Sequence, residues 1–247
     1  MSFSLGAKRV LITGASAGIG AAVAREFAAA GAAVGICARR GERLDQVLAD
    51  CQAVSADPGS CRRWVVDLAR LQGISAFARQ VEEELGPVDV LVNNAGYAVW
   101  KPLEATTTAE WDHTFAVNVR AAACLCAAVL PGMQERGFGR IINIGSEAGV
   151  AIVPGLAAYC VSKHALRALT EVIQEGNHGN GIKAWVICPG FVDTEMGYVV
   201  PGGDPGSFLR VDEVVDVARF LLRTGDNVKL GPEILVRTMR NPMAAQE

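Results

Sequence analysis

The sequence has little charge, few aromatic side chains and no excess of positive charge. Charged residues make up 20% of the chain and aromatic residues 6%, and the formal net charge is −3 at pH 7. Proteins that bind nucleic acid or anionic membranes concentrate lysine and arginine on one surface. The composition therefore argues against both kinds of partner.

Long apolar segments are also missing from the printed sequence. No run approaches the roughly 20 apolar residues that a membrane span requires. The first residues, MSFSLGAKRVLITGAS, lack the apolar stretch of a signal peptide. We therefore expect a cytoplasmic protein without a membrane partner.

Histidine is scarce, with 3 residues in the chain, and the 7 cysteines are scattered. Cys124 and Cys126 form a C-x-C with no histidine or second cysteine pair nearby, so no metal site is predicted. The cysteines are expected to be free and mostly buried, as in a reducing compartment. We expect His113 and His164 on helix surfaces, without a catalytic role.

What the chain does contain is an alternation of short β-branched runs and longer alanine-rich runs. RVLIT precedes GIGAAVAREFAAAG, AVGICA precedes ERLDQVLAD, and RWVVD precedes LQGISAFARQVEEELG. The runs VDVLVNNAG, GRIINIGS and IKAWVICPG continue the pattern, with long helices expected at about 109–136 and 157–174. Apolar strands between helices are typical of a parallel sheet covered on both faces. We predict an α/β fold with one domain over 1–247, a Rossmann-type doubly wound parallel sheet flanked by helices.

The segment TGASAGIG, residues 13–20, follows the first expected strand and opens the first helix. Gly14 allows a tight turn, Gly18 lets the backbone approach a ligand, and Gly20 allows close packing of the helix. The N terminus of the helix offers free N–H groups to a pyrophosphate. Taken alone, the loop is also compatible with an ordinary strand-to-helix turn, but its position at the first βα junction favours a dinucleotide site.

The end of the second expected strand, GICARRGER, indicates which dinucleotide is bound. Ala38 stands where an acidic residue would accept the ribose hydroxyls of NAD, and Arg39 and Arg40 follow it. Arginines suit the 2′-phosphate of NADP through charge-assisted hydrogen bonds, and Arg39 is closer to the strand end. Two observations weaken this interpretation, since both arginines can be solvated at a helix start and Ala17 adds no second basic contact. We predict NADP (NADPH) as the cofactor, with NAD less favoured.

The segment AAYCVSKHAL, residues 157–166, places Tyr159 and Lys163 four residues apart on one face of a helix. An ammonium beside a phenol favours the phenolate, so we expect Lys163 to lower the pKa of Tyr159. Ser146, in NIGSEAG, follows a strand at the edge where open α/β sheets bind ligands. Its hydroxyl is expected to hold a substrate oxygen near Tyr159. Each of these residues taken singly is also compatible with an ordinary helix or loop position.

Six segments in this order closely resemble the classical short-chain dehydrogenase/reductase family over about residues 5–235. They are TGASAGIG at 13–20, NNAG at 93–96, Asn118 in FAVNVRA, Ser146, YCVSK at 159–163 and CPGFVDT at 188–194. The resemblance implies a Rossmann-type sheet, a nicotinamide cofactor and hydride transfer between the nicotinamide and a carbonyl or alcohol.

The resemblance also implies roles for individual residues. Tyr159 would donate or accept the proton, and Lys163 would lower its pKa and bind the nicotinamide ribose. Ser146 would orient the substrate carbonyl, and Asn118 would hold a water that relays protons to Lys163. The cofactor would contact Gly14, Ser16, Gly18, Ile19, Gly20, Arg39, Arg40, Asp67, Leu68, Asn94, Ala95, Gly96, Tyr159, Lys163, Pro189, Gly190, Val192 and Thr194.

The substrate pocket is expected to form from residues 97–100, residues 149–156 and a substrate loop at about 191–210. The glycines and prolines of the loop, FVDTEMGYVVPGGDPGSFLR, break regular structure, and its apolar content predicts a substrate without strong charge. The leading prediction is an NADP-dependent carbonyl reductase or alcohol dehydrogenase. An NAD-preferring dehydrogenase of the same fold and a dinucleotide-sensing protein without turnover stay open as alternatives.

The helix expected at 109–136 carries NVRAAACLCAAVL, which is small and apolar on more than one face. The family that the chain resembles pairs this helix and the next one across two-fold axes. We therefore expect a homo-oligomer, a tetramer in the first place and a dimer as the alternative.

Overall fold

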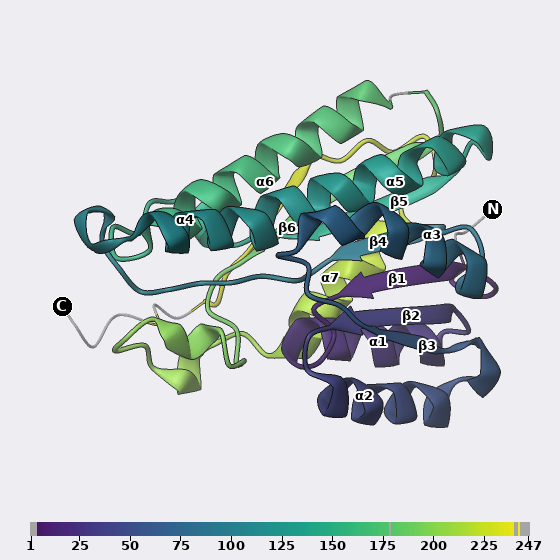
Figure 1. Cartoon of the computed structure of the whole chain (residues 1–247), viewed down its shortest axis with the longest axis horizontal. Helices are drawn as coiled ribbons and strands as arrows, with labels where there is room; N and C mark the ends of the chain where they lie inside the picture. The colour runs from purple at the N-terminus through teal and green to yellow at the C-terminus, as the bar shows by residue number, and fades with distance from the viewer. Residues whose placement is uncertain (1–3, 178, 240–241, 243–247) are drawn as a thin grey trace.

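A parallel sheet forms the centre of the protein (Figure 1). The structure is a computed structural model that describes residues 4–177, 179–239 and 242. Within these residues seven strands pair in the order β3-β2-β1-β4-β5-β6-β7, and every neighbouring pair is parallel. The order runs outward in both directions from β1 and β4, as in a doubly wound sheet. The predicted fold class is confirmed.

The strands and helices alternate along the chain. The strands are β1 (Arg9–Thr13), β2 (Ala33–Ala38), β3 (Arg62–Val65), β4 (Val90–Asn93), β5 (Gly139–Ile144), β6 (Ile182–Pro189) and β7 (Glu233–Val236). The helices are α1 (Gly18–Ala29), α2 (Gly41–Val54), α3 (Ile74–Leu85), α4 (Thr108–Phe115), α5 (Ala121–Glu135), α6 (Ala157–Gly176) and α7 (Val211–Arg223).

Helices cover both faces of the sheet, which explains why its central strands are apolar throughout. Successive side chains of a strand point to opposite faces. In β1, Val10 and Ile12 therefore pack into the core beneath α1, α2 and α7, whereas Leu11 packs into the core beneath α3 and α5. Figure 1 shows the same division, with α1, α2 and α7 on one side and α3, α5 and α6 on the other.

The helix expected at 109–136 is continuous over Thr108–Glu135 and contains one irregular turn. Thr107 and Glu110 form a capping box that starts α4. A π-helical turn, Ala116–Arg120, joins α4 to α5. By length and composition alone Thr108–Glu135 is apolar enough to cross a membrane, which corrects our prediction that no run approaches a span. The buried side of α5 packs on the sheet, and 39% of the most apolar window of this helix is buried inside the protein.

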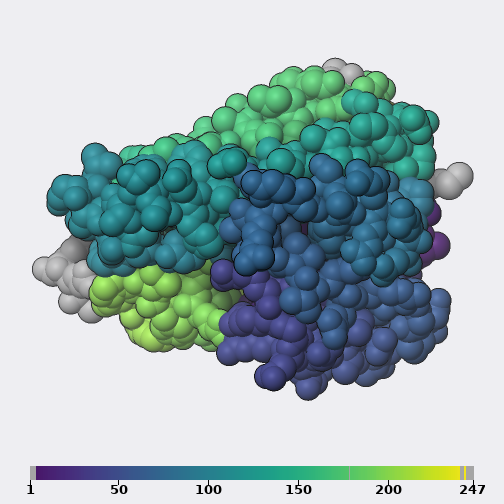
Figure 2. Space-filling model, in the orientation of Figure 1, coloured from purple at the N-terminus to yellow at the C-terminus, as the bar shows by residue number. Residues whose placement is uncertain are grey.

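The segment 191–210 folds back on itself instead of forming an open loop. A β-bridge joins Val192 to Leu209, and the rings of Phe191 and Phe208 stack with centroids 5.2 Å apart. Figure 2 shows this segment in light green beside the purple N-terminal part of the chain. The segment therefore has a small apolar cluster of its own at the carboxyl end of β6.

Candidate active site

A cavity of about 670 Å³ lies at the carboxyl edge of the sheet, where β1 and β4 diverge into its two halves. Parallel α/β sheets bind ligands at this edge, and pockets of roughly 300–1,000 Å³ hold small molecules and cofactors. All the residues predicted for the site line this cavity except Asn118 and Gly20. The chain thus brings together side chains that are up to 180 residues apart, from Gly14 to Thr194.

The glycine-rich loop after β1 is held against the segment that follows β4. Gly14 has φ +65°, and a Cβ on it would lie 2.7 Å from the backbone of Ala95. A Cβ on Gly20 would lie 2.4 Å from Asn94 Nδ2, so Gly20 packs against Asn94 rather than facing the cavity. The backbone N–H groups of Asn94 and Ala95 each donate to Thr13 Oγ1 at 3.0 Å. These contacts fix the backbone of the loop close to the cavity.

The N terminus of α1 fits a pyrophosphate. Ala17 occupies the N-cap position, where it offers no side-chain acceptor, and the first turn of α1 carries no acidic residue. The first N–H groups of a helix lack intrahelical partners and carry a partial positive charge. Because these groups open onto the cavity at Ala17 and Gly18, an anion placed there would be stabilised.

Two arginines at the end of β2 differ in their surroundings. Arg39 is exposed, lines the cavity and makes no hydrogen bond or ion pair with any residue in the described ranges. Arg40 donates from Nε to Ser16 Oγ at 3.1 Å and from Nη1 to Glu195 Oε2 at 2.7 Å. Asp67 lines the same end of the cavity. Arg39 therefore presents an unpaired cation to a ligand, as the 2′-phosphate of NADP would require.

Tyr159 and Lys163 lie one turn apart on α6, and both are buried. Lys163 Nζ lies 5.5 Å from the centroid of the Tyr159 ring and donates to the backbone oxygen of Ile144 at 2.7 Å. Burial raises the pKa of Tyr159 to about 12 and lowers the pKa of Lys163 to about 8. Our prediction that Lys163 lowers the Tyr159 pKa is wrong for this structure, because desolvation opposes the charged form of both groups.

Ser146 and Tyr159 meet at the floor of the cavity. Ser146 caps the short turn Glu147–Gly149, and its Oγ accepts from Ala148 N at 3.1 Å. The Ser146 side chain lies near Tyr159 and lowers the Tyr159 pKa, in the opposite direction to burial. Two hydroxyls thus converge on one point, where they can hold a carbonyl oxygen.

Asn118 lies in the π-helical turn behind the cavity. Its Oδ1 accepts from Tyr97 N at 2.7 Å, and its Nδ2 donates to Tyr97 O and to Ser162 Oγ, both at 2.9 Å. Ser162 in turn donates to the backbone oxygen of Tyr159 at 2.7 Å. The Asn118 side chain therefore connects the segment after β4 to α6. Its role in holding a water stays a prediction, although π-helical turns often occur at functional sites.

A sequence model of the short chain dehydrogenase family matches residues 8–201. The chain belongs to this family. It is 32% identical over 244 residues to D-threitol dehydrogenase from Mycolicibacterium smegmatis, a match that covers 95% of this chain and 93% of the relative. The family membership makes the chain an NAD(P)-dependent oxidoreductase that acts on small molecules.

Solved structures of the family share the fold over nearly the whole chain. A metagenomic short-chain oxidoreductase in complex with NADP is 33% identical with a TM-score of 0.81, and the match covers 96% of this chain and 99% of that one. An alcohol dehydrogenase from the archaeon Thermococcus sibiricus, complexed with 5-hydroxy-NADP, is 29% identical with a TM-score of 0.85 and coverages of 95% and 98%. A nicotinamide dinucleotide is therefore the cofactor class of this dehydrogenase.

Around Tyr159 the wall of the dehydrogenase cavity is apolar. The packed group consists of Ala148, Leu156, Tyr159 and Cys160 with Ala98, Val153 and Val200. Met196 closes the group, since its Sδ accepts from the Tyr159 hydroxyl at 3.9 Å. This wall suits an uncharged part of a ligand.

Two residues of the expected substrate pocket point elsewhere. The ring of Trp100 packs over Gly155, where a Cβ would lie 2.5 Å from the ring, and Trp100 does not line the cavity. The Tyr198 hydroxyl donates to Asp193 Oδ1 at 2.7 Å, and the Tyr198 ring packs on Phe208 outside the cavity. Closeness in sequence to a motif therefore did not predict whether these side chains face the cavity.

Sequence reasoning missed two acidic residues that line the cavity. Glu147 directly follows Ser146, and its Oε1 lies 2.7 Å from Arg237 Nε. Glu195 directly follows Thr194 and pairs with Arg40. The one available signal was the adjacency of each carboxylate to a motif residue.

The two histidines and the cysteines singled out in the sequence do not line the cavity. The His113 ring packs edge-on against Tyr97 at 4.6 Å, and His164 Nδ1 lies 2.9 Å from Cys160 O. Both histidines are half-buried rather than on the helix surface as we expected. All seven cysteines are free, and all except Cys124 are buried. Within the described part of the chain, no cluster of three histidine, cysteine, aspartate or glutamate residues could hold a metal ion.

Proposed function

We propose that this dehydrogenase is an NADP-dependent carbonyl reductase whose acid/base is Tyr159. The observation that carries the proposal is the convergence of the Ser146 and Tyr159 hydroxyls at an apolar wall, with Lys163 one helical turn behind them. The substrate is a small carbonyl compound, or the corresponding alcohol in the reverse direction, without strong charge near the reacting carbon.

The chain's residues orient the carbonyl group and move one proton. When bound, the nicotinamide supplies the hydride that the carbonyl carbon receives. Ser146 donates a hydrogen bond to the carbonyl oxygen, and the neutral Tyr159 hydroxyl transfers its proton to that oxygen as the alcohol forms. Because burial raises the pKa of Tyr159 to about 12, the phenol carries this proton at neutral pH. Lys163 would bind the nicotinamide ribose, and Asn118 would position the water that returns a proton through Lys163.

The arginines support NADP over NAD. Ala38 offers no carboxylate to the ribose hydroxyls, and Arg39 lines the cavity as an unpaired cation among the described residues. Asp67 and Leu68 would flank the adenine, and Asn94 to Gly96 together with Pro189 to Thr194 would line the remaining length of the dinucleotide. Neither alternative, an NAD-preferring enzyme or a sensor without turnover, has a comparable observation in its favour.

We also propose a domain organisation, a cellular location and an oligomeric state. We place one catalytic domain over 1–247, with the segment 191–210 as its substrate loop, because eight of its residues between Phe191 and Val200, though not Asp193 or Tyr198, line the cavity. A cytoplasmic location agrees with the free cysteines. A homotetramer, with a dimer as the alternative, agrees with the exposed apolar side chains of α6, α7 and β7, which are Val161, Val172, Phe220 and Leu235.

The test is the absorbance change of NADPH with a panel of ketones, aldehydes and alcohols. We expect turnover with an uncharged carbonyl compound and a higher kcat/KM with NADPH than with NADH. A higher kcat/KM with NADH on the same substrate would contradict the cofactor assignment. Turnover by a Tyr159→Phe variant at the wild-type rate would contradict the assignment of the acid/base.

A further inference from the structure

The arginines at the adenosine end of the cavity are engaged by a carboxylate from the opposite side. Glu195, in the segment 191–210, binds Arg40 Nη1 with Oε2 at 2.7 Å and binds Arg43 Nη1 with Oε1. Arg40 also donates from Nε to Ser16 Oγ at 3.1 Å. Glu195 therefore connects the substrate loop to the first turn of α2 through Arg43, and Arg40 extends the connection to Ser16 in the glycine-rich loop.

This connection crosses the dinucleotide groove. Arg40 and Glu195 both line the cavity. The neighbouring Thr194 lies over the glycine-rich loop, since a Cβ on Gly18 would lie 3.1 Å from Thr194 Cγ2. In Figure 2 the light green segment meets the purple N-terminal part of the chain. The pairs thus join the segment 191–210 to the end of β2 across the mouth of the proposed dinucleotide site.

A 2′-phosphate at this place would meet one free arginine and one paired arginine. Arg39 has no partner among the residues described, whereas Arg40 is shared between Ser16 and Glu195. A phosphate monoester carries a charge of roughly −1.5 to −2 near pH 7 and offers three acceptor oxygens. It is therefore a stronger acceptor for a guanidinium than one carboxylate.

We propose that Glu195 competes with the 2′-phosphate of the cofactor for Arg40. This competition lowers the affinity for NADP. The ion pair also restrains the substrate loop until the phosphate binds. This inference rests on the NADP site proposed above. Binding of the phosphate to Arg39 and Arg40 would release Glu195 and free the segment 191–210 at the adenosine end. Glu195 would thus be a specificity-determining residue that also couples cofactor binding to the loop.

The exposure of the three side chains makes this exchange feasible. Their exposed fractions are 60% for Glu195, 44% for Arg40 and 53% for Arg43. Ion pairs as exposed as these are weak and easily replaced by a better acceptor. Arg43 does not line the cavity, so the exchange at the phosphate concerns Arg40 alone.

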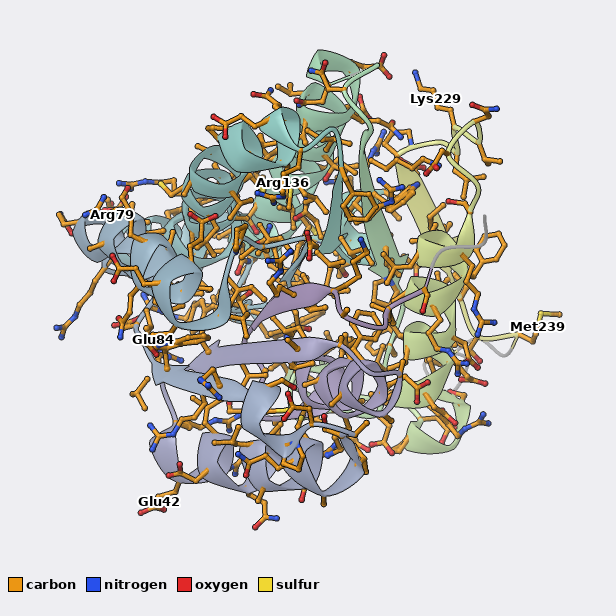
Figure 3. The ribbon with its side chains drawn as sticks, turned by 90° about the vertical axis from the view of Figure 1, so that its right-hand side faces the viewer. Glu42, Arg79, Glu84, Arg136, Lys229 and Met239 are labelled. Atoms are coloured by element: carbon orange, nitrogen blue, oxygen red, sulfur yellow. The ribbon has the colours of Figure 1, made fainter. Side chains whose placement is uncertain are left out.

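The chain offers a matched control for the charge of Glu195. Glu42 lies in the first turn of α2 next to Arg43, is exposed and makes no ion pair with any residue that the structure describes. Figure 3 shows its side chain pointing into solvent. A Glu42→Gln variant therefore removes the same charge from the same region without touching Arg40.

The test is calorimetric titration of the full-length protein with 2′,5′-ADP and with 5′-AMP, which differ by the 2′-phosphate. We expect Glu195→Gln to bind 2′,5′-ADP about three- to fivefold more tightly than wild type, as expected for loss of an exposed ion pair, with 5′-AMP unchanged. Glu42→Gln should change both affinities by less than this. In an Arg40→Met background, Glu195→Gln should bring no gain.

Hydrogen exchange of the peptide covering 194–200 gives a second readout. In wild type, 2′,5′-ADP should speed exchange there while 5′-AMP should not, and in Glu195→Gln exchange should be fast without ligand. A Glu195→Gln variant that behaves like Glu42→Gln, or that binds 2′,5′-ADP more weakly, would overturn the competition while leaving the NADP site intact. Equal wild-type affinity for the two nucleotides would overturn the NADP site and the competition together.

Discussion

The ammonium of Lys163 lies 5.5 Å from the centre of the Tyr159 ring, and both side chains are buried. Burial disfavours the charged form of each group, so the pKa of Tyr159 rises to about 12 while that of Lys163 falls to about 8. The pair therefore combines a protonated phenol with an amine that can release its proton close to neutral pH.

The lowered pKa of Lys163 predicts a pH dependence of stability. Between pH 8 and 10.5 the unfolded chain keeps the proton that the folded chain has lost, so wild-type stability rises with pH in this window relative to Lys163→Met. The rise should be at most about 3 kcal/mol. Urea unfolding of both proteins at pH 7.5 and pH 10 measures it. A difference between the two proteins that does not change with pH would show that Lys163 is not desolvated in the folded state.

Arg39 provides a prediction about the cofactor. Arg39→Asp replaces attraction by repulsion at the 2′-phosphate, so it should weaken NADPH binding at least about tenfold while NADH changes little. Dissociation constants from fluorescence titration give the ratio. Arg79→Asp on α3 is the control, because Arg79 is also exposed, points into solvent (Figure 3) and does not line the cavity. An unchanged NADPH to NADH ratio in Arg39→Asp would place the phosphate elsewhere.

The segment 191–210, which we propose as the substrate loop, carries a matched pair of residues. Met196 lines the cavity with its Sδ 3.9 Å from the Tyr159 hydroxyl, whereas Tyr198 lies outside the cavity. Met196→Phe should therefore change the ratio of KM for a bulky carbonyl substrate to KM for a small one by about tenfold. Tyr198→Phe should leave this ratio unchanged. Both variants should keep the NADPH dissociation constant within a few-fold. The same substrate profile in Met196→Phe as in wild type would mean that the segment 191–210 does not form the substrate wall.

The oligomer can be tested on the exposed face of α6. Val172 is 70% exposed on α6, and Val54 on α2 is 48% exposed. If α6 pairs with a second copy of the chain, Val172→Asp should place an uncompensated charge in that interface and reduce the molar mass in light scattering at micromolar concentration. Val54→Asp should not reduce it. A wild-type protein that is already a monomer would contradict the expected assembly.

The sequence predicted the fold because the strand-helix alternation and the loop TGASAGIG are local patterns with a known physical cause. It also predicted which residues meet in the cavity, since the carboxyl ends of parallel strands share one edge. It could not predict the pairing of Arg40 with Glu195, which are 155 residues apart, because only the folded chain brings them together. The direction of Tyr198 was missed for the same reason, since Asp193 and Phe208 hold that side chain outside the cavity.

The direction of the Tyr159 pKa shift could also not be predicted from the sequence. The spacing to Lys163 was visible as four residues, but the degree of burial depends on Met196 and on the apolar group around Cys160, which come from other segments. Desolvation then raises the Tyr159 pKa more than the interaction with Ser146 lowers it. The motifs predicted which residues line the cavity, whereas the pKa shifts of these residues required the packed structure.

The central claim is that Tyr159 transfers the proton in carbonyl reduction, and the Tyr159→Phe variant tests it most directly. The change removes one hydroxyl, so the account predicts that kcat falls by about 10²- to 10⁴-fold while the NADPH dissociation constant stays within about twofold of wild type. Single-turnover absorbance at 340 nm and fluorescence titration measure the two quantities on the same preparation. A Tyr159→Phe variant that binds NADPH normally and reduces the substrate at the wild-type rate would contradict the account.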